Sequence, residues 1–183
     1  PDLLVPALRQ FAMDDHQAIR ALMLRRLAYL QSHHRELGWA LFDLAMENDA
    51  TGLWAMAEPC LYYAYHRQFE IVGPALARLS LEGADEDLKT WGRISALAAL
   101  SKKIDLPIFL ADLSSNGSAE AWRGAASVWT HHENMQQHRE QCMAGLAAGL
   151  NQEGPCAVAV AHKLCSVFRD TSQVAIPTAL IQR

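Results

Sequence analysis

The sequence predicts an all-α protein, and three observations lead to that prediction. Alanine and leucine, which rank highest in helix propensity, account for 30 and 25 of the 183 residues, against only seven valines and seven isoleucines. No segment alternates apolar and polar residues over more than a few positions, as a half-buried strand would. Apolar residues recur instead at helical spacing between short runs of turn-forming residues. With 51% hydrophobic and 20% charged residues, the chain can bury a core.

Cap and turn residues divide the first third of the chain into short helices. Asp14 and Asp15 precede an apolar run over 19–30 and are expected to cap its amino end. Residues 35–47 place leucines at helical spacing and end before an Asn-Asp pair. A short helix is then expected to open at Thr51-Gly52.

Proline and glycine mark the next boundaries. Pro59 is expected to interrupt or restart a helix, because proline fits a first helical turn and not an interior. The helix that follows places Leu61, Tyr65, Phe69 and Val72 on one face. Gly73-Pro74 is expected to start another helix, and Gly83 to end it in a left-handed backbone conformation.

The second half follows the same rules. Acidic residues 85–87 and the lysine pair 102–103 complement the dipole of one helix at its two ends. Asp105 caps a helix that ends near Leu113, and 114–117 form a turn. The remaining helices are expected from Ser118 to Trp129, from Met135 to Leu150 with Asn151 as the stop, and from Pro155 to about Asp170. Gly145 and Gly149 lie within a helix, where close packing explains them.

Short helices joined by short turns suggest antiparallel hairpins and internal repetition. Three segments align around an arginine. The first two begin with an acidic residue, the last two place alanine three residues after the arginine, and the spacings suit repeats of roughly 30 to 40 residues. The expected repeats form a single array over 1–183, near 14–47, 51–83, 85–113, 118–150 and 155–183. The residues of the shared pattern are Asp14, Arg20, Asp87, Arg93, Ala96, Arg123 and Ala126.

This pattern resembles the HEAT repeat, in which an acidic residue is followed after four others by an apolar residue and an arginine, then by small residues. The resemblance implies an α-solenoid of stacked antiparallel helical hairpins. It also implies that the aspartate bonds the arginine of the same or the adjacent repeat. Asp87 to Leu100 is the best copy, although Gly92 replaces the usual valine, and the copy around Arg123 has Gly117 in place of its acid.

Irregular aromatic-rich stretches add a second resemblance. The stretches Glu36 to Phe42, Leu61 to Phe69, and Trp91 to Ile94 resemble the C-terminal sensor arms of bacterial NTPases of the STAND (NACHT-like) type. That resemblance implies binding of a foreign protein and release of an ATPase and effector outside these residues. The chain opens at Pro1 without an initiator Met and ends on an apolar stretch, 174–181, so we expect it to belong to a longer protein.

The most distinctive stretch for binding is aromatic and basic. Tyr, Trp and Arg dominate interface hot spots because they bury area at low entropic cost. The alternative is that these rings wedge between helices with their hydroxyls bonded to backbone. Arg25-Arg26 raises the same question, with salt bridging between repeats as the simpler answer. The predicted partner-binding residues are Tyr62, Tyr63, His66, Arg67, Arg93 and Arg123.

A metal-binding or enzymatic alternative rests on two helical pairs. His138 and Cys142 lie four residues apart and His162 and Cys165 three apart, so two helix faces could supply four zinc ligands. Cys142 also lies in line with core leucines, which favours a small buried residue. No GxSxG, GxxxxGK[ST] or GxGxxG motif occurs. The prediction is therefore a non-catalytic module without a cofactor.

Nucleic-acid binding is a second alternative, since some HEAT-like proteins bind DNA. Arg20, Arg25, Arg26, Arg93 and Arg123 could line a basic groove, but a net charge of −4 argues against it. No stretch approaches the roughly 20 apolar residues of a membrane helix, and four scattered cysteines favour a reducing, cytoplasmic setting. The expected partner is another protein or an adjacent domain.

Overall fold

The computed structural model describes residues 4–47 and 50–167, and these residues confirm the all-α prediction. They form eleven helices and, within the described ranges, no strand. The helices are α1 (Leu4–Ala12), α2 (Gln17–His33), α3 (Arg35–Glu47), α4 (Trp54–Ala64), α5 (Phe69–Glu82), α6 (Asp85–Leu100), α7 (Leu106–Asn116), α8 (Ala119–Trp129), α9 (His132–Gln137), α10 (Arg139–Leu150) and α11 (Pro155–Val167).

The helices fall into two compact units, Pro1–Asp87 and Leu88–Arg183. Helices α1 to α5 belong to the first unit and α7 to α11 to the second. Helix α6 begins with the last three residues of the first unit and continues into the second.

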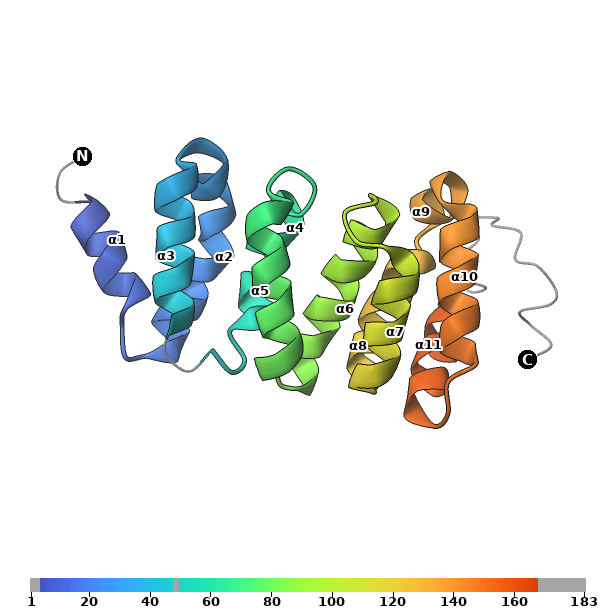
Figure 1. The fold of residues 1–183 in the computed structure, drawn as a ribbon. Coiled ribbons are helices and arrows are strands. Elements are labelled where there is room, and N and C mark those ends of the chain that lie inside the picture. The colour runs from blue at the N-terminus through green and yellow to red at the C-terminus, as the bar shows by residue number, and fades with distance from the viewer. Residues whose placement is uncertain (1–3, 48–49, 168–183) are drawn as a thin grey trace. The chain divides into compact units, whose positions relative to one another are not determined.

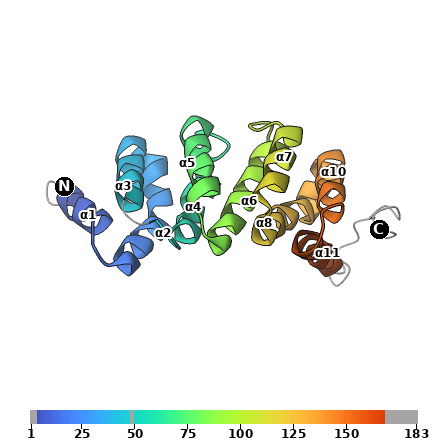
Figure 2. The same cartoon turned by 60° about the horizontal axis from the view of Figure 1, so that its bottom comes forward.

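In the first unit α2 is the central helix, because it packs against α1, α3 and α4. Helices α3 and α5 lie on one side of this unit and α2 and α4 on the other (Figures 1 and 2). Helices α2 and α4 run in the same direction, so both end at the same edge (Figure 1). The fully buried large side chains of this unit are Leu24, Leu41, Met46, Leu53, Trp54, Leu61 and Leu79.

In the second unit α8 is the central helix, in contact with α9, α10 and α11. Its two tryptophans, Trp122 and Trp129, are fully buried and their ring centroids lie 6.2 Å apart. Phe109 of α7 joins them edge-on, 6.4 Å from Trp129 and 5.9 Å from Trp91 of α6. Edge-to-face rings at these separations are the favoured aromatic geometry, so this cluster is the core of the unit.

Several helix boundaries predicted from local residues are confirmed. Residues 35–47 are helical as predicted. The side chain of Asp105 accepts a hydrogen bond of 3.3 Å from the Ile108 N–H, as predicted for an N-cap. Ser118, predicted to open the next helix, also caps it, accepting a hydrogen bond of 3.3 Å from the Ala121 N–H. Asn151 follows the end of α10, also as predicted.

Two boundaries predicted from proline are wrong, whereas α11 begins at Pro155 as predicted. Pro59 lies inside α4 and Pro74 inside α5, where buried neighbours such as Cys60 and Leu76 hold each helix together despite the missing N–H donor. The chain turns instead at residues 65–68, which contain neither glycine nor proline. Tyr65, Phe69 and Val72 therefore do not continue one helical face from Leu61.

The predicted backbone conformation of Gly83 is also wrong. It is extended, with φ −68° and ψ 137°. Glycine is required there because a Cβ would lie 2.6 Å from the carbonyl oxygen of Leu79. The left-handed conformation occurs at Lys102, with φ 58°, and at Gly117, with φ 70°. Helix α6 thus ends at Leu100, before the predicted lysine pair, and α7 continues to Asn116 through the predicted turn.

Three further boundaries differ from the prediction. Helix α1 precedes Asp14, where none was predicted; its Pro6 lies in the first turn, which tolerates proline. The N-cap of α2 is His16 and not an aspartate, although Asp14 accepts a 2.8 Å hydrogen bond from the His16 N–H. The helix predicted from Met135 to Leu150 breaks at His138, between α9 and α10. Asp170 and residues 174–181 lie outside the described residues.

Candidate partner-binding site

The site begins at the edge of the first unit where α2 and α4 end. Two buried contacts position these helices: the Cys60 thiol donates to the Leu24 carbonyl at 3.2 Å, and Arg20 Nη1 donates to the Ala45 carbonyl at 3.1 Å. Burial raises the pKa of the Cys60 thiol to about 12, so it remains a neutral donor. These contacts fix α2 against α4 and α3.

The turn after α4 is held from the neighbouring helix. The Trp39 Nε1–H of α3 donates to Gln68 Oε1 at 2.5 Å, and the Gln68 N–H donates to the Ala64 carbonyl at 2.8 Å. Arg35 forms an exposed ion pair with Glu70, which ties the start of α3 to the start of α5. The turn therefore presents His66 and Arg67 in a defined position beside the end of α2.

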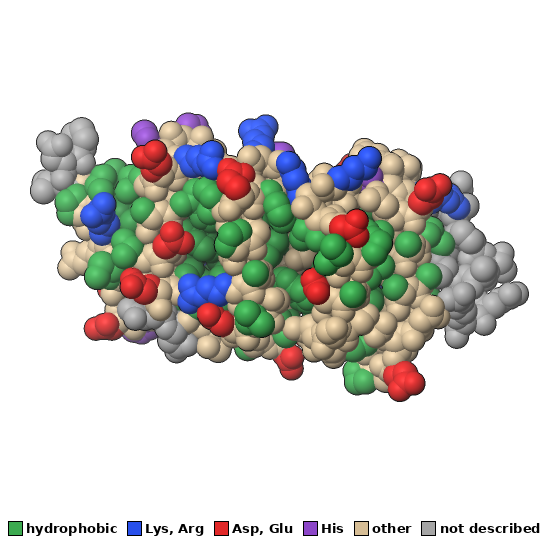
Figure 3. All heavy atoms as spheres, in the orientation of Figure 1, with side chains coloured by type: hydrophobic (Ala, Val, Ile, Leu, Met, Phe, Trp, Pro, Cys, Tyr) green, Lys and Arg blue, Asp and Glu red, His purple; other side chains and the backbone are tan. Residues whose placement is uncertain are grey.

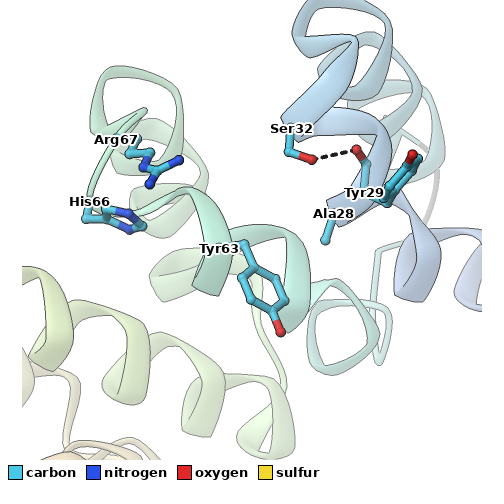
Figure 4. Close-up of a pocket in the computed structure, with 6 residues that line it drawn as sticks. All are labelled: Ala28, Tyr29, Ser32, Tyr63, His66 and Arg67. Atoms are coloured by element: carbon cyan, nitrogen blue, oxygen red, sulfur yellow. Dashed lines mark hydrogen bonds between the residues drawn. The ribbon is translucent and has the colours of Figure 1, made fainter.

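A pocket of about 410 Å³ lies between α2 and α4 at this edge. Figure 4 shows His66 and Arg67 on the α4 side, facing Ser32 and Ala28 across the pocket. The Ser32 hydroxyl donates to the Tyr29 carbonyl at 2.7 Å (Figure 4). We call this the Tyr63–Arg67 pocket; its lining residues are Ala28, Tyr29, Ser32, Tyr63, His66 and Arg67.

The aromatic residues of this pocket differ from the other large aromatics of the chain. Tyr29 is 71% exposed and Tyr63 65% exposed, whereas none of the five tryptophans is more than 5% exposed. The Tyr29 ring stacks on the His33 ring with centroids 4.2 Å apart. Exposed tyrosines beside an arginine are the composition typical of interface hot spots. The core does not use these rings, so they remain available to a partner.

The charge of the pocket is positive. Within the described ranges, Arg67 has no carboxylate partner, whereas Arg35 is paired with Glu70 and Arg78 with Glu82. Figure 3 shows arginine and histidine side chains, with some acidic ones among them, along the edge of the first unit where these turns lie. A second hollow of about 440 Å³ is lined by residues 34–37.

The structure brings together three of the predicted partner-binding residues, Tyr63, His66 and Arg67. Tyr62 lies beside them and is 39% exposed, with its ring against those of Tyr63 and Tyr65. Arg93 and Arg123 belong to the second unit and do not line this pocket.

Sequence reasoning missed the wall of the pocket that α2 contributes: Ala28, Tyr29 and Ser32. A signal for them was present, because Tyr29 and Leu22 fall on a face of α2 opposite to buried Leu24 and Leu27. Large apolar residues exposed on one face of a helix, opposite its buried face, are a signal for a surface with a role beyond packing.

The residues of the repeat pattern have roles that differ from those the HEAT resemblance implies. Asp87 is fully buried, and among the described residues it bonds backbone amides and not an arginine. Its carboxylate accepts from Gly52 N at 2.9 Å, Ala55 N at 3.2 Å and Ala84 N at 3.3 Å. Of these three donors Ala55 lies in the first turn of α4, where the backbone amides need such an acceptor because they have no intrahelical partner.

The three aligned arginines occupy three different environments. Arg20 is buried against the Ala45 carbonyl, so it cannot contribute to a basic groove for nucleic acid. Arg93 is exposed, and Arg123 pairs with Glu120 on its own helix. Ala96 and Ala126 are fully buried, as small residues at a helix contact should be. Arg25 and Arg26 are exposed.

The four residues of the zinc alternative do not form a site. The described residues contain no group of three or more His, Cys, Asp or Glu side chains placed to hold a metal ion. Cys142 is buried, its thiol lies 3.5 Å from the Asn134 carbonyl, and burial raises its pKa to about 12. His162 and Cys165 are exposed on α11, and His138 lies at the break before α10.

Comparison with known proteins identifies no relative: no family model matches the chain, and no curated protein or solved structure is significantly similar to it. Among the described residues, no helix combines the length and apolarity that a bilayer span needs.

Proposed function

We propose that this chain is a non-catalytic protein-binding module built from HEAT-like helical repeats, and that the Tyr63–Arg67 pocket is part of its binding surface. The observation that supports the proposal most directly is the pocket itself. It combines two exposed tyrosines with an arginine that has no carboxylate partner in the described part of the chain. Such residues dominate protein interfaces because a partner desolvates them at low entropic cost.

The positions of the helices support the repeat arrangement. The pairs α2/α3, α4/α5 and α8/α10 are in contact, and they fall within the predicted repeat ranges 14–47, 51–83 and 118–150. Small residues, among them Ala96 and Ala126, are buried where helices meet. Repeat modules of this kind bind partners through surface positions on a rigid scaffold.

The setting we propose is the sensor region of a larger cytoplasmic bacterial NTPase, as the resemblance to STAND sensor arms implies. In that setting the partner would stimulate nucleotide hydrolysis by the protein that carries the module. The variant Tyr63→Ala would remove that stimulation, because Tyr63 lies on the surface that we assign to the partner.

The test uses the purified chain as bait in a native lysate, with quantitative mass spectrometry of the captured proteins. We expect a stoichiometric partner that Tyr63→Ala and Arg67→Ala each reduce at least tenfold. The matched controls lie in the second unit: Ile108→Ala, an apolar side chain 60% exposed, and Lys103→Ala, an exposed cation. Equal capture by all four variants would refute the assignment of this pocket.

A further inference from the structure

We propose that the Tyr63–Arg67 pocket recognises an acidic segment of a partner protein, with a carboxylate at Arg67 and an aromatic or apolar neighbour against Tyr63. This inference rests on the proposed function and names the chemistry of its ligand. It follows from the distribution of charge around the pocket, from the pocket's size, and from the kinds of side chain that line it.

The pocket is lined by one arginine without an ion-pair partner among the described residues, Arg67, and a second such arginine, Arg25, lies next to the lining residues of α2. Helix α2 contains three arginines and no acidic residue. Arg20 is buried, but Arg25 is exposed and lies three, four and seven residues before Ala28, Tyr29 and Ser32, on the same helical face. Arg67 stands on the opposite wall. Neither Arg25 nor Arg67 has an ion-pair partner among the residues that the structure describes.

The chemistry of these groups favours a carboxylate. A guanidinium binds a carboxylate through two parallel hydrogen bonds, which adds geometric selectivity to the charge attraction. The Ser32 hydroxyl, which already donates to the Tyr29 carbonyl, retains acceptor capacity for an N–H of the bound segment. The Tyr63 ring offers an apolar face for the neighbouring side chain, because it is 65% exposed.

The size of the pocket favours side chains of a peptide over a nucleic-acid strand. Its volume of about 410 Å³ lies at the low end of small-ligand pockets, which span ~300–1,000 Å³. Nucleic-acid affinity depends on neutralising many phosphates along a track. Here the adjoining Arg35 is already paired with Glu70, Glu36 lies beside it, and the whole chain carries a net charge of −4. A short acidic peptide matches this local charge, and a polyanion does not.

The test measures binding of a fluorescein-labelled peptide, Gly-Glu-Tyr-Glu-Glu-Phe-Glu-Gly, to the full chain by fluorescence anisotropy. We expect it to bind about tenfold more tightly than the same peptide with glutamine at each glutamate, which is the size of one charge-assisted hydrogen bond. Arg67→Glu should abolish the preference, and Arg67→Lys should retain only part of it, because lysine lacks the guanidinium fork. Lys103→Glu, in the second unit, should leave binding unchanged.

Other results overturn the inference. Equal affinity for the glutamine peptide, an equal loss with Lys103→Glu, or tighter binding of a single-stranded RNA of the same length would each do so. A competition experiment, in which excess acidic peptide is added to the captured partner, distinguishes a failure of this inference from a failure of the proposed function. If Tyr63→Ala abolishes capture of a lysate partner but excess acidic peptide does not displace it, the pocket binds protein and the acidic assignment is wrong. If capture is insensitive to Tyr63→Ala and Arg67→Ala, the proposed function fails.

Discussion

The two units of the chain bring their helices together by different means. In the second unit four helical glycines allow close approach, and the tightest contacts are reciprocal: a Cβ on Gly92 would lie 2.0 Å from the Ala121 carbonyl oxygen, and one on Gly124 would lie 2.1 Å from that of Lys89. The other two, Gly145 and Gly149, lie against tryptophan rings. Close packing of this kind leaves little room for change.

The first unit has one such glycine, Gly38 against Gln31, and joins its helices with charged side chains as well. Arg20 and Arg78 donate to the carbonyls of Ala45 and Met46 in α3. Asp87 accepts from the Gly52 N–H before α4 and from the Ala55 N–H in its first turn. Its exposed tyrosines are not needed for packing. We therefore expect substitutions at the helix contacts of the second unit to lower stability, and substitutions at the pocket of the first unit to weaken binding.

The largest effect is expected from Gly124→Val. Because a Cβ at this position would overlap the Lys89 carbonyl, α6 and α8 must separate, and the free energy of unfolding should fall by about 3 kcal/mol. Denaturant unfolding measures it. The matched control is Gly73→Ala in α5, where a Cβ would lie 3.4 Å from the Phe69 ring, an ordinary contact. That variant should be about 0.5–1 kcal/mol more stable, since alanine favours the helix.

The rate at which a buried thiol is modified measures how often its own unit opens. Cys60 lies in the first unit and Cys142 in the second, and both are fully buried. Labelling with a thiol reagent, followed by mass spectrometry, should show that Gly124→Val accelerates modification of Cys142 more than that of Cys60. Equal acceleration at both thiols would show that the units open together and would remove the basis of the comparison.

Asp87→Ala should have the next largest effect, about 2 kcal/mol, because three backbone amides lose a buried carboxylate acceptor. In the labelling experiment this variant should expose Cys60 more than Cys142. Asp85→Ala is the control, since Asp85 is exposed in the first turn of the same helix and should cost under about 0.5 kcal/mol. A comparable loss at Asp85 would mean that the helix dipole, and not the amide contacts, explains the effect.

Alkaline pH should destabilise both units through these thiols. Burial raises the pKa of Cys60 and of Cys142 to about 12 in the folded state, from 9.0 for a thiol in water. The unfolded state therefore loses these protons first, and stability is full below pH 9 and falls as pH rises toward 12. Each thiol contributes a slope of up to about 1.4 kcal/mol per pH unit. The pH dependence of the free energy of unfolding, compared between the native chain and the double variant Cys60→Ala/Cys142→Ala, measures this contribution. Identical slopes for the two proteins would contradict the raised pKa values of the thiols.

The smallest effect on stability is expected at the pocket. Tyr63→Ala and Arg67→Glu should change the free energy of unfolding by less than about 0.5 kcal/mol, because both side chains are exposed. The same variants should show the largest loss of partner binding. Thermal unfolding of the two variants beside the native chain provides the measurement, and a marked destabilisation would reassign these residues to structure.

The local elements that the sequence predicts well are those that local chemistry sets. The caps at Asp105 and Ser118 and the helix over 35–47 depend on residues within a few positions of one another. The failures at Pro59 and Pro74 have the opposite origin, since packing from other helices outweighs the local cost of a proline. The turn at 65–68 is likewise held by Trp39, a residue far away in the chain.

The sequence by itself determined that this chain is helical, and it identified Tyr63, His66 and Arg67 as candidate binding residues from their composition and spacing. Tertiary structure decided which of them face a common pocket, and it added Tyr29 and Ser32 from α2. It also decided that the Asp87 carboxylate accepts hydrogen bonds from backbone N–H groups and that Arg20 is buried. The physical reason is range: helix propensity and capping act over a few residues, whereas a pocket wall depends on which helices pack together, and that depends on the fit of whole faces.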